Sequence, residues 1–157
     1  MQTTSALRYT NVQDRVKEIG AKQIEHMVTW GAGSSFGEYA IHPLELAISC
    51  MGPKVRGVMR RGTGAQSQLL LDFAKGRTAV VNVYTASSTP FAATLTTKET
   101  TEYLAVDSGA IFRNTAAAFL DLFDSGQPGI DRKESLVIRR VLDLAGKKRT
   151  TKGFVRL

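Results

Sequence analysis

Apolar positions along the chain follow two patterns, one typical of helices and one typical of strands. Spacings of three and four residues predict helices over 11–20, around 38–52, over 112–123 and over 131–146. Alternation of apolar and polar residues predicts strands over 21–30, 54–61, 66–73, 78–86, 91–97 and 101–106, with a short edge strand over 153–157. Short connections between consecutive strands favour an antiparallel meander. The expected fold class is α+β, a mostly antiparallel open sheet with helices packed on one face.

Both faces of the predicted sheet carry apolar side chains. Leu69, Leu71 and Phe73 alternate with Leu70, and the next strand repeats this with Val80 and Tyr84 on one of its faces. The alternation does not decide which set meets the helices. Glycine-containing turns are expected at 62–64 and 74–76.

Length and composition fit a globular protein. We expect the 157 residues to form one domain, 1–157, because that length is typical of a single hydrophobic core. The only cysteine, Cys50, excludes an internal disulfide and fits a reducing compartment. No apolar run reaches the roughly 18 residues that span a bilayer, and the N-terminus lacks the apolar segment of a signal peptide. A cytoplasmic protein without a membrane partner is therefore expected.

The net charge of +7 raises the question of a nucleic-acid partner. Basic residues gather at 54–61 and 147–156, but a surface for single strands would interleave such charges with aromatic rings. The first cluster has no aromatic residue and the second has only Phe154. Solvated basic faces explain both clusters, and we do not expect nucleic acid to be the partner.

The candidate chemistry lies in the stretch 30–52. Helical spacing places His42, Glu45 and Ser49 on one side of a helix, and Glu38 joins them if the helix continues through Pro43 with a kink. Alternatively, the regular helix begins near Pro43 and Glu38 lies in the preceding turn. A histidine between carboxylates suits proton transfer near neutral pH, and those carboxylates are expected to raise its pKa. The alternative is that His42 merely bridges the two carboxylates and steadies the helix.

A glycine-rich loop precedes this helix but does not match a nucleotide-binding fingerprint. The dinucleotide motif needs a third glycine at position 36, which is Phe36, and an acidic residue about 20 positions further on, where Arg56–Arg61 stands. No phosphate-binding loop of the G-x-x-x-x-G-K type is present. We therefore expect neither a cofactor-binding site nor a metal site in this chain.

Four segments, in order, resemble the C-terminal domain of the glucose–fructose oxidoreductase/inositol dehydrogenase/MocA (Gfo/Idh/MocA) family. Ser5–Tyr9 resembles the segment that leaves the family's Rossmann domain, and Gly33–Glu45 resembles the helix with its Asp-x-x-x-His motif. Leu69–Val80 resembles the central hairpin, and Phe119–Leu144 the closing helices. The resemblance implies that residues 1–20 are a lead-in after a Rossmann domain that this chain does not contain.

The resemblance also implies a function. Family members bind NAD or NADP in the Rossmann domain and a sugar or polyol against the second domain, and they often pair as dimers through the open sheet face. His42 matches the catalytic histidine, and Glu38 stands where the family has aspartate. Candidate substrate contacts are Glu45, Tyr39, Trp30 and Arg8.

The family's Glu-Lys-Pro lysine and cofactor fingerprint are absent, so the chain alone is expected to be catalytically inactive. Two alternatives stay open. One is a stand-alone, non-catalytic interaction module on the same scaffold, and the other is a basic-surface nucleic-acid binder.

Overall fold

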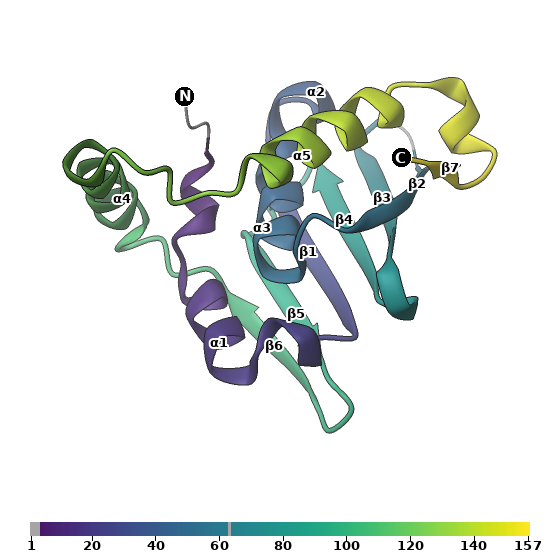
Figure 1. The fold of residues 1–157 in the computed structure, drawn as a ribbon. Coiled ribbons are helices and arrows are strands. Elements are labelled where there is room, and N and C mark those ends of the chain that lie inside the picture. Colours follow the sequence, from purple (N-terminus) through teal and green to yellow (C-terminus); the bar gives the residue numbers. More distant parts are fainter. Residues whose placement is uncertain (1–3, 63) are drawn as a thin grey trace.

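The fold is a seven-stranded mixed sheet with helices packed on one face (Figure 1). The structure is a computed structural model that describes residues 4–62 and 64–157. The strands are β1 (His26–Ala32), β2 (Val55–Arg61), β3 (Gln66–Phe73), β4 (Thr78–Tyr84), β5 (Ala92–Thr96), β6 (Thr101–Ala105) and β7 (Val155–Arg156). Their order in the sheet is β6-β5-β1-β4-β3-β2-β7. The expected α+β class is confirmed.

The prediction of a continuous antiparallel meander is wrong at one point in the sheet. β2, β3 and β4 pair antiparallel in sequence, and so do β5 and β6, but β1 lies between β4 and β5. β1 is parallel to β4 and antiparallel to β5. A parallel pair requires a long crossover, which runs here through two helices and two strands. β1 also begins later than expected, at His26, because Ala21–Gln23 form a 3-10 turn.

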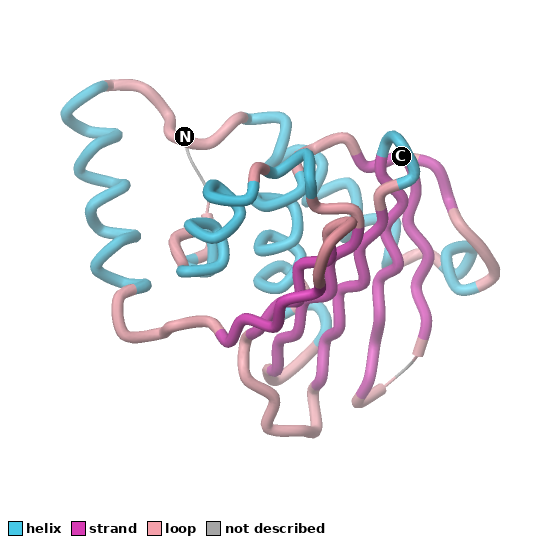
Figure 2. Tube along the Cα trace, turned by 90° about the horizontal axis from the view of Figure 1, so that it is seen from below, coloured by secondary structure: helices cyan, strands magenta, loops and turns pink. Residues whose placement is uncertain are grey.

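The helices are α1 (Asn11–Ile19), α2 (Phe36–Tyr39), α3 (Ile41–Met51), α4 (Ile111–Ser125) and α5 (Arg132–Ala145). α3 is the central helix: it packs on β1 and β4, and α5 packs across it and onto β2. In Figure 2 the strands form one layer and most of the helices lie beside it. Eight α3 residues are buried, which explains its nearly continuous apolar sequence.

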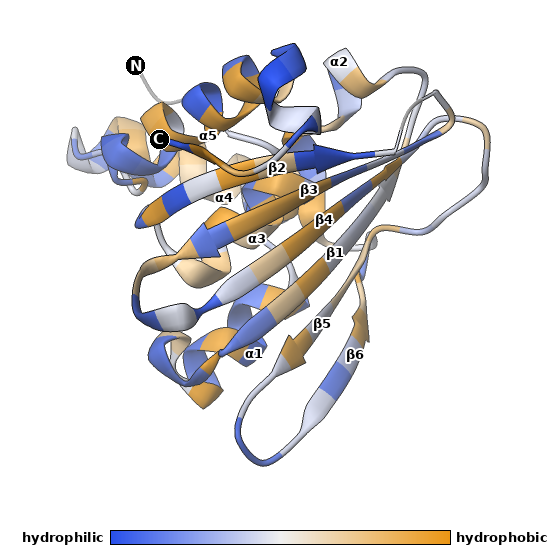
Figure 3. Cartoon of the chain, turned by 90° about the vertical axis from the view of Figure 1, so that its right-hand side faces the viewer, coloured by the Kyte–Doolittle hydropathy of each residue, from blue (hydrophilic) through white to orange (hydrophobic). Residues whose placement is uncertain are grey.

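The structure decides which face of the sheet meets the helices. Met27, Leu69, Leu71, Val81 and Val83 are buried beneath them. The opposite face, seen in Figure 3, carries their alternating neighbours. Its central strip runs across paired strands and consists of Tyr103, Thr94, Val28, Val80, Leu70 and Met59.

Helix starts differ in detail from the sequence pattern. Thr10, and not Asn11, caps α1, and Gln13 completes a capping box with it. At α5, Asp131 accepts from the Lys133 N–H, but the Glu134 side chain does not return to the cap. The expected box is therefore only half formed. Of the expected turn at 62–64, Thr63 lies outside the described residues, as do residues 1–3 of the expected lead-in.

α4 stands apart from the sheet at the left edge of Figures 1 and 2. Its main contact is with the 3-10 turn Ala6–Arg8. The apolar stripe that predicted it is largely exposed, at 76% for Phe112, 62% for Leu120 and 77% for Phe123. The helix forms as the spacing predicted, but within the described part of the chain its apolar side lacks a covering layer. Among the described residues, no helix has the length and apolarity to cross a membrane.

Candidate functional site

The candidate site is built around the first turn of α3. Ser35 caps α2 by accepting from the Glu38 N–H, the chain passes through Ala40, and α3 begins at Ile41. Pro43 is then the third residue of α3, where its missing N–H costs no helical hydrogen bond. The structure thus resembles the alternative in which the helix begins near Pro43.

Glu38 is not brought to His42. Its carboxylate accepts from the Ser34 and Ser35 hydroxyls, at 2.5 and 3.1 Å, and these hydrogen bonds lower its pKa. The side chain is exposed at the start of α2. Its hydrogen bonds are therefore local, to the two serines just before α2.

His42 is half-buried and held at one ring nitrogen. Its Nδ1 lies 2.9 Å from Ser5 Oγ. The rings of Tyr39 and Phe91 meet it edge-on, at centroid distances of 5.6 and 6.2 Å. Burial lowers the pKa of His42, while the charge of Glu45 opposes that shift. The expectation of a raised pKa was wrong because loss of solvent outweighs the one carboxylate nearby.

Tyr39 reaches His42 because of a glycine. A Cβ added at Gly33 would lie 1.9 Å from Tyr39 Cγ, so only glycine leaves room for this ring. The glycine-rich loop that superficially suggested a nucleotide site therefore accommodates an aromatic wall beside His42.

Glu45 belongs to a buried ion-pair network beneath His42. Its carboxylate accepts from the Ser5 backbone N–H at 2.8 Å and from Arg8 Nε at 2.9 Å. Arg8 Nη1 donates to Glu134 of α5. Burial of the guanidinium lowers the pKa of Arg8, but the hydrogen bonds to Glu134 and Glu45 raise it by more, so the pKa lies above its usual value. The network fixes the chain before α1 against both α3 and α5.

Trp30 lies on the other side of the sheet. Thr29 donates to the Pro43 carbonyl on the helix side, so the next residue faces away from α3. There the Trp30 ring packs against Tyr103, with centroids 6.1 Å apart. The structure thus brings His42, Tyr39, Glu45 and Arg8 together, and separates Trp30 and Glu38 from them.

Two contacts of the site were missed from the sequence, those of Ser5 and Glu134. Ser5 and His42 are 37 residues apart and Arg8 and Glu134 are 126 apart, so no local spacing could have joined them. A cavity of about 370 Å³ opens beside His42. Its wall comes from the lead-in, α3 and α5, and comprises Thr4, Ser5, Ile41, His42, Glu45, Ser135, Ile138, Arg139 and Leu142.

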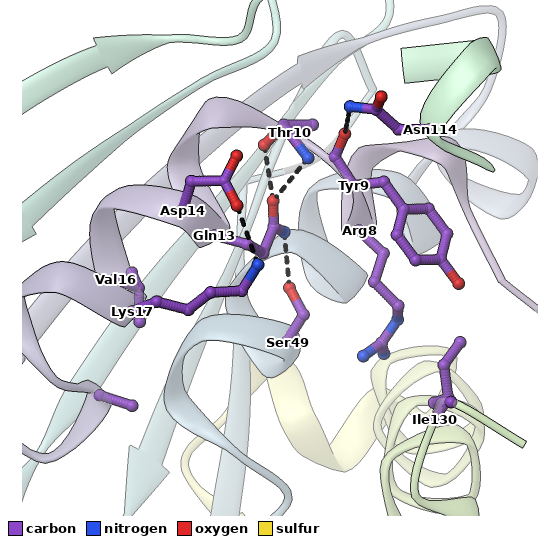
Figure 4. A pocket seen from close by; sticks show the side chains of 12 residues that line it. Arg8, Tyr9, Thr10, Gln13, Asp14, Val16, Lys17, Ser49, Asn114 and Ile130 are labelled. Carbon is purple, nitrogen blue, oxygen red and sulfur yellow. Dashed lines mark hydrogen bonds and ion pairs between the residues drawn. The ribbon is translucent and has the colours of Figure 1, made fainter. Parts of the chain in front are cut away.

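A second cavity, of about 500 Å³, lies between α1, α3 and α4 (Figure 4). Gln13 lines it and uses its full amide: it accepts from Thr10 and donates to Leu7 O and Ser49 Oγ. Ser49, which shares the His42 side of α3, is therefore engaged in a structural network. In the described residues, no group of three or more His, Cys, Asp or Glu side chains is placed to hold a metal ion.

Comparison with known proteins identifies the architecture. No protein-family model and no curated protein matches the sequence. Solved structures do match: GenD2 from gentamicin A biosynthesis in complex with NAD has a TM-score of 0.72 at 14% identity, covering 97% of this chain and 62% of that one. The aldose-aldose oxidoreductase from Caulobacter crescentus, complexed with glycerol, scores 0.71 at 14% identity, covering 97% and 62%.

Apo scyllo-inositol dehydrogenase from Lactobacillus casei is a third similar structure. It scores 0.73 at 11% identity, covering 96% of this chain and 60% of that one. The chain has the fold of a Gfo/Idh/MocA C-terminal domain. It spans about three fifths of the length of each of these three solved chains. At these identities the likeness establishes the fold, and the activity requires a separate argument.

Proposed function

We propose that this chain is the substrate-binding half of an NAD(P)-dependent oxidoreductase that acts on a sugar, polyol or related hydroxy or keto compound. One observation carries the proposal: His42, half-buried and held through Nδ1, stands beside a cavity of about 370 Å³ on a Gfo/Idh/MocA fold. A histidine so placed can act as acid or base at the reacting oxygen. Tyr39, whose ring meets His42 edge-on but does not line the cavity itself, is the proposed aromatic contact for a sugar ring at its margin.

The cofactor, NAD or NADP, belongs to a Rossmann domain that would be the partner of this chain. Hydride transfer needs the cofactor held against the substrate carbon, and the chain has no fingerprint for it. The exposed α4 stripe supports such a partner, since Phe112, Leu120 and Phe123 form an apolar surface of the kind that a neighbouring domain covers. We infer that the chain alone is inactive.

Arg8 and Glu45 take a supporting part in this proposal. Both side chains are less than a tenth exposed, and Arg8 is paired with Glu134 as well as with Glu45. Glu45 also lines the His42 cavity, so it contributes the polar floor of the substrate site.

A homodimer through the open sheet face is the proposed assembly. Val28, Leu70 and Val80 form an apolar strip there, opposite to the helical layer. A twofold pair would cover this strip on both copies. Trp30, the only tryptophan, borders the strip, so its emission should shift to shorter wavelength as the dimer forms. Leu70→Lys should yield a monomer by light scattering, whereas the matched change Leu120→Lys on exposed α4 should leave the dimer intact.

Calorimetry and the gene sequence test the half-enzyme proposal. The isolated chain should show no binding of NADH or NADPH, and the coding sequence in frame before residue 1 should encode a dinucleotide-binding domain. Cofactor binding by the isolated chain at affinities typical of a Rossmann enzyme would contradict the proposal. A gene that begins at Met1 would instead favour the interaction module. A salt-sensitive shift of an oligonucleotide would favour the nucleic-acid binder.

A further inference from the structure

Ser5 holds the ring of His42 from a fixed position. Its backbone N–H donates to Glu45 at 2.8 Å, and its side chain is the N-cap of the turn Ala6–Arg8, where it accepts from the Leu7 N–H at 3.3 Å. The residue is only 7% exposed. The hydroxyl therefore has little freedom except rotation of its hydrogen.

Counting donors and acceptors decides which way the Ser5–His42 hydrogen bond runs. If His42 Nδ1–H donated to Ser5 Oγ, the Ser5 hydroxyl hydrogen would need another acceptor, and the described residues supply none. A buried hydroxyl hydrogen without an acceptor is costly, about 1–3 kcal/mol. If instead the Ser5 hydroxyl donates to a bare Nδ1, the Ser5 hydroxyl and Nδ1 are both satisfied, and only the ring N–H at Nε2 is left for a partner outside the described residues.

We propose that Ser5 is a positioning residue that fixes neutral His42 as the tautomer with its proton on Nε2. The role of this tautomer toward a substrate rests on the proposed function, whereas the tautomer itself is inferred from the hydrogen bonds of Ser5. Nε2 makes no hydrogen bond to a described residue, so the N–H that Ser5 places there is available to a substrate oxygen. The site is thereby preset to donate a hydrogen bond to a carbonyl or hydroxyl oxygen.

The surroundings keep the ring neutral. Burial of the ring disfavours the imidazolium and outweighs the charge of Glu45, although Arg8, Glu45 and Glu134 together carry one net negative charge. Arg139 of α5, which lines the same cavity, is paired with Asp143, and the packed rings of Tyr39 and Phe91 carry no charge. A ring in this form polarises a carbonyl, which favours binding of the oxidised substrate. Accepting a proton from an alcohol at Nε2 would first require the ring proton to move to Nδ1 and the Ser5 hydroxyl to turn away.

Nitrogen-15 NMR of the imidazole rings in the 157-residue chain tests this directly. The chain has only two histidines, and His26, whose Nδ1 lies 2.8 Å from Thr78 Oγ1, serves as the internal control. At about pH 8, where histidine is neutral, His42 should show a bare Nδ1 and a protonated Nε2. A protonated Nδ1 would overturn the proposal.

Two variants extend the test. Ser5→Ala keeps the backbone bond to Glu45 and should move His42 toward a mixture of tautomers, while the His26 spectrum stays unchanged. Ser5→Thr retains the hydroxyl and should restore the Nε2–H form. An unchanged His42 spectrum in Ser5→Ala would contradict the role of Ser5. The measurement needs neither cofactor nor turnover, so a correct tautomer in a chain that proves not to be an oxidoreductase would reject the proposed function alone.

Discussion

Replacing Arg8 with methionine removes the cation that joins three elements of the fold. The side chains of Arg8, Glu45 and Glu134 are 9%, 4% and 17% exposed, so Arg8→Met leaves two shielded carboxylates without their partner. Removing one member of a buried ion pair typically costs about 3–5 kcal/mol. That is a large fraction of the roughly 5–15 kcal/mol that stabilises an ordinary domain.

Arg139→Met is the matched control. Arg139 pairs with Asp143 on α5, but these side chains are 78% and 54% exposed. Such a pair contributes only about 0.3–0.5 kcal/mol. Replacing the entire buried network by apolar residues, as Arg8→Met with Glu45→Leu and Glu134→Leu, should recover much of the stability lost in Arg8→Met.

Urea unfolding followed by circular dichroism measures these differences. Arg8→Met should lower the transition midpoint with little change in the slope of free energy against urea. If Arg8→Met cost no more than Arg139→Met, the buried network would not be the link between the lead-in, α3 and α5. The same result would remove the support that the network gives to Ser5 and His42.

Three further predictions concern single positions. Burial holds the pKa of His42 in the folded chain below its usual 6.5, so at pH values between the folded and unfolded pKa the unfolded chain binds more protons. The free energy of unfolding should therefore fall as the pH drops below about 6.5. Unfolding measured as a function of pH should show a flatter dependence for His42→Gln. Burial raises the pKa of Cys50 to about 12, so iodoacetamide should label it only after unfolding. Phe123→Asp should change the stability of the isolated chain by at most about 0.5 kcal/mol, because the ring is 77% exposed. In the protein joined to its Rossmann domain, the same substitution should weaken the contact between the two domains, which faster limited proteolysis would detect.

Local periodicity predicted most elements of the fold. The β3–β4 hairpin has the expected alternation, with Leu69 and Val81 inward and Leu70 and Val80 outward, because half-buried strands must alternate. The insertion of β1 between β4 and β5 could not be predicted the same way. Strand pairing depends on contacts between residues far apart in the chain, and the pattern within each strand is the same whichever neighbour it meets.

The candidate site was predicted in part for a similar reason. Helical spacing placed His42 and Glu45 together, since neighbouring turns of one helix share a side. It could not reveal that Ser5 and Arg8 return to these residues, nor that Ser34 and Ser35 bind Glu38. The direction of the His42 pKa shift was missed because burial arises from packing by Tyr39 and Phe91, which the helix pattern does not contain.

We propose that His42 acts on the reacting oxygen in an NAD(P)-dependent oxidoreductase. The most direct test of this role is oxidation of NADH or NADPH with a panel of keto sugars and inosose-type ketones, measured for the chain joined to its dinucleotide-binding domain and for the His42→Ala variant of that protein. His42→Ala should lower kcat by about 10²–10⁴-fold and change KM far less. A folded His42→Ala enzyme with kcat within a few-fold of wild type, and only its thermal stability reduced, would contradict this role.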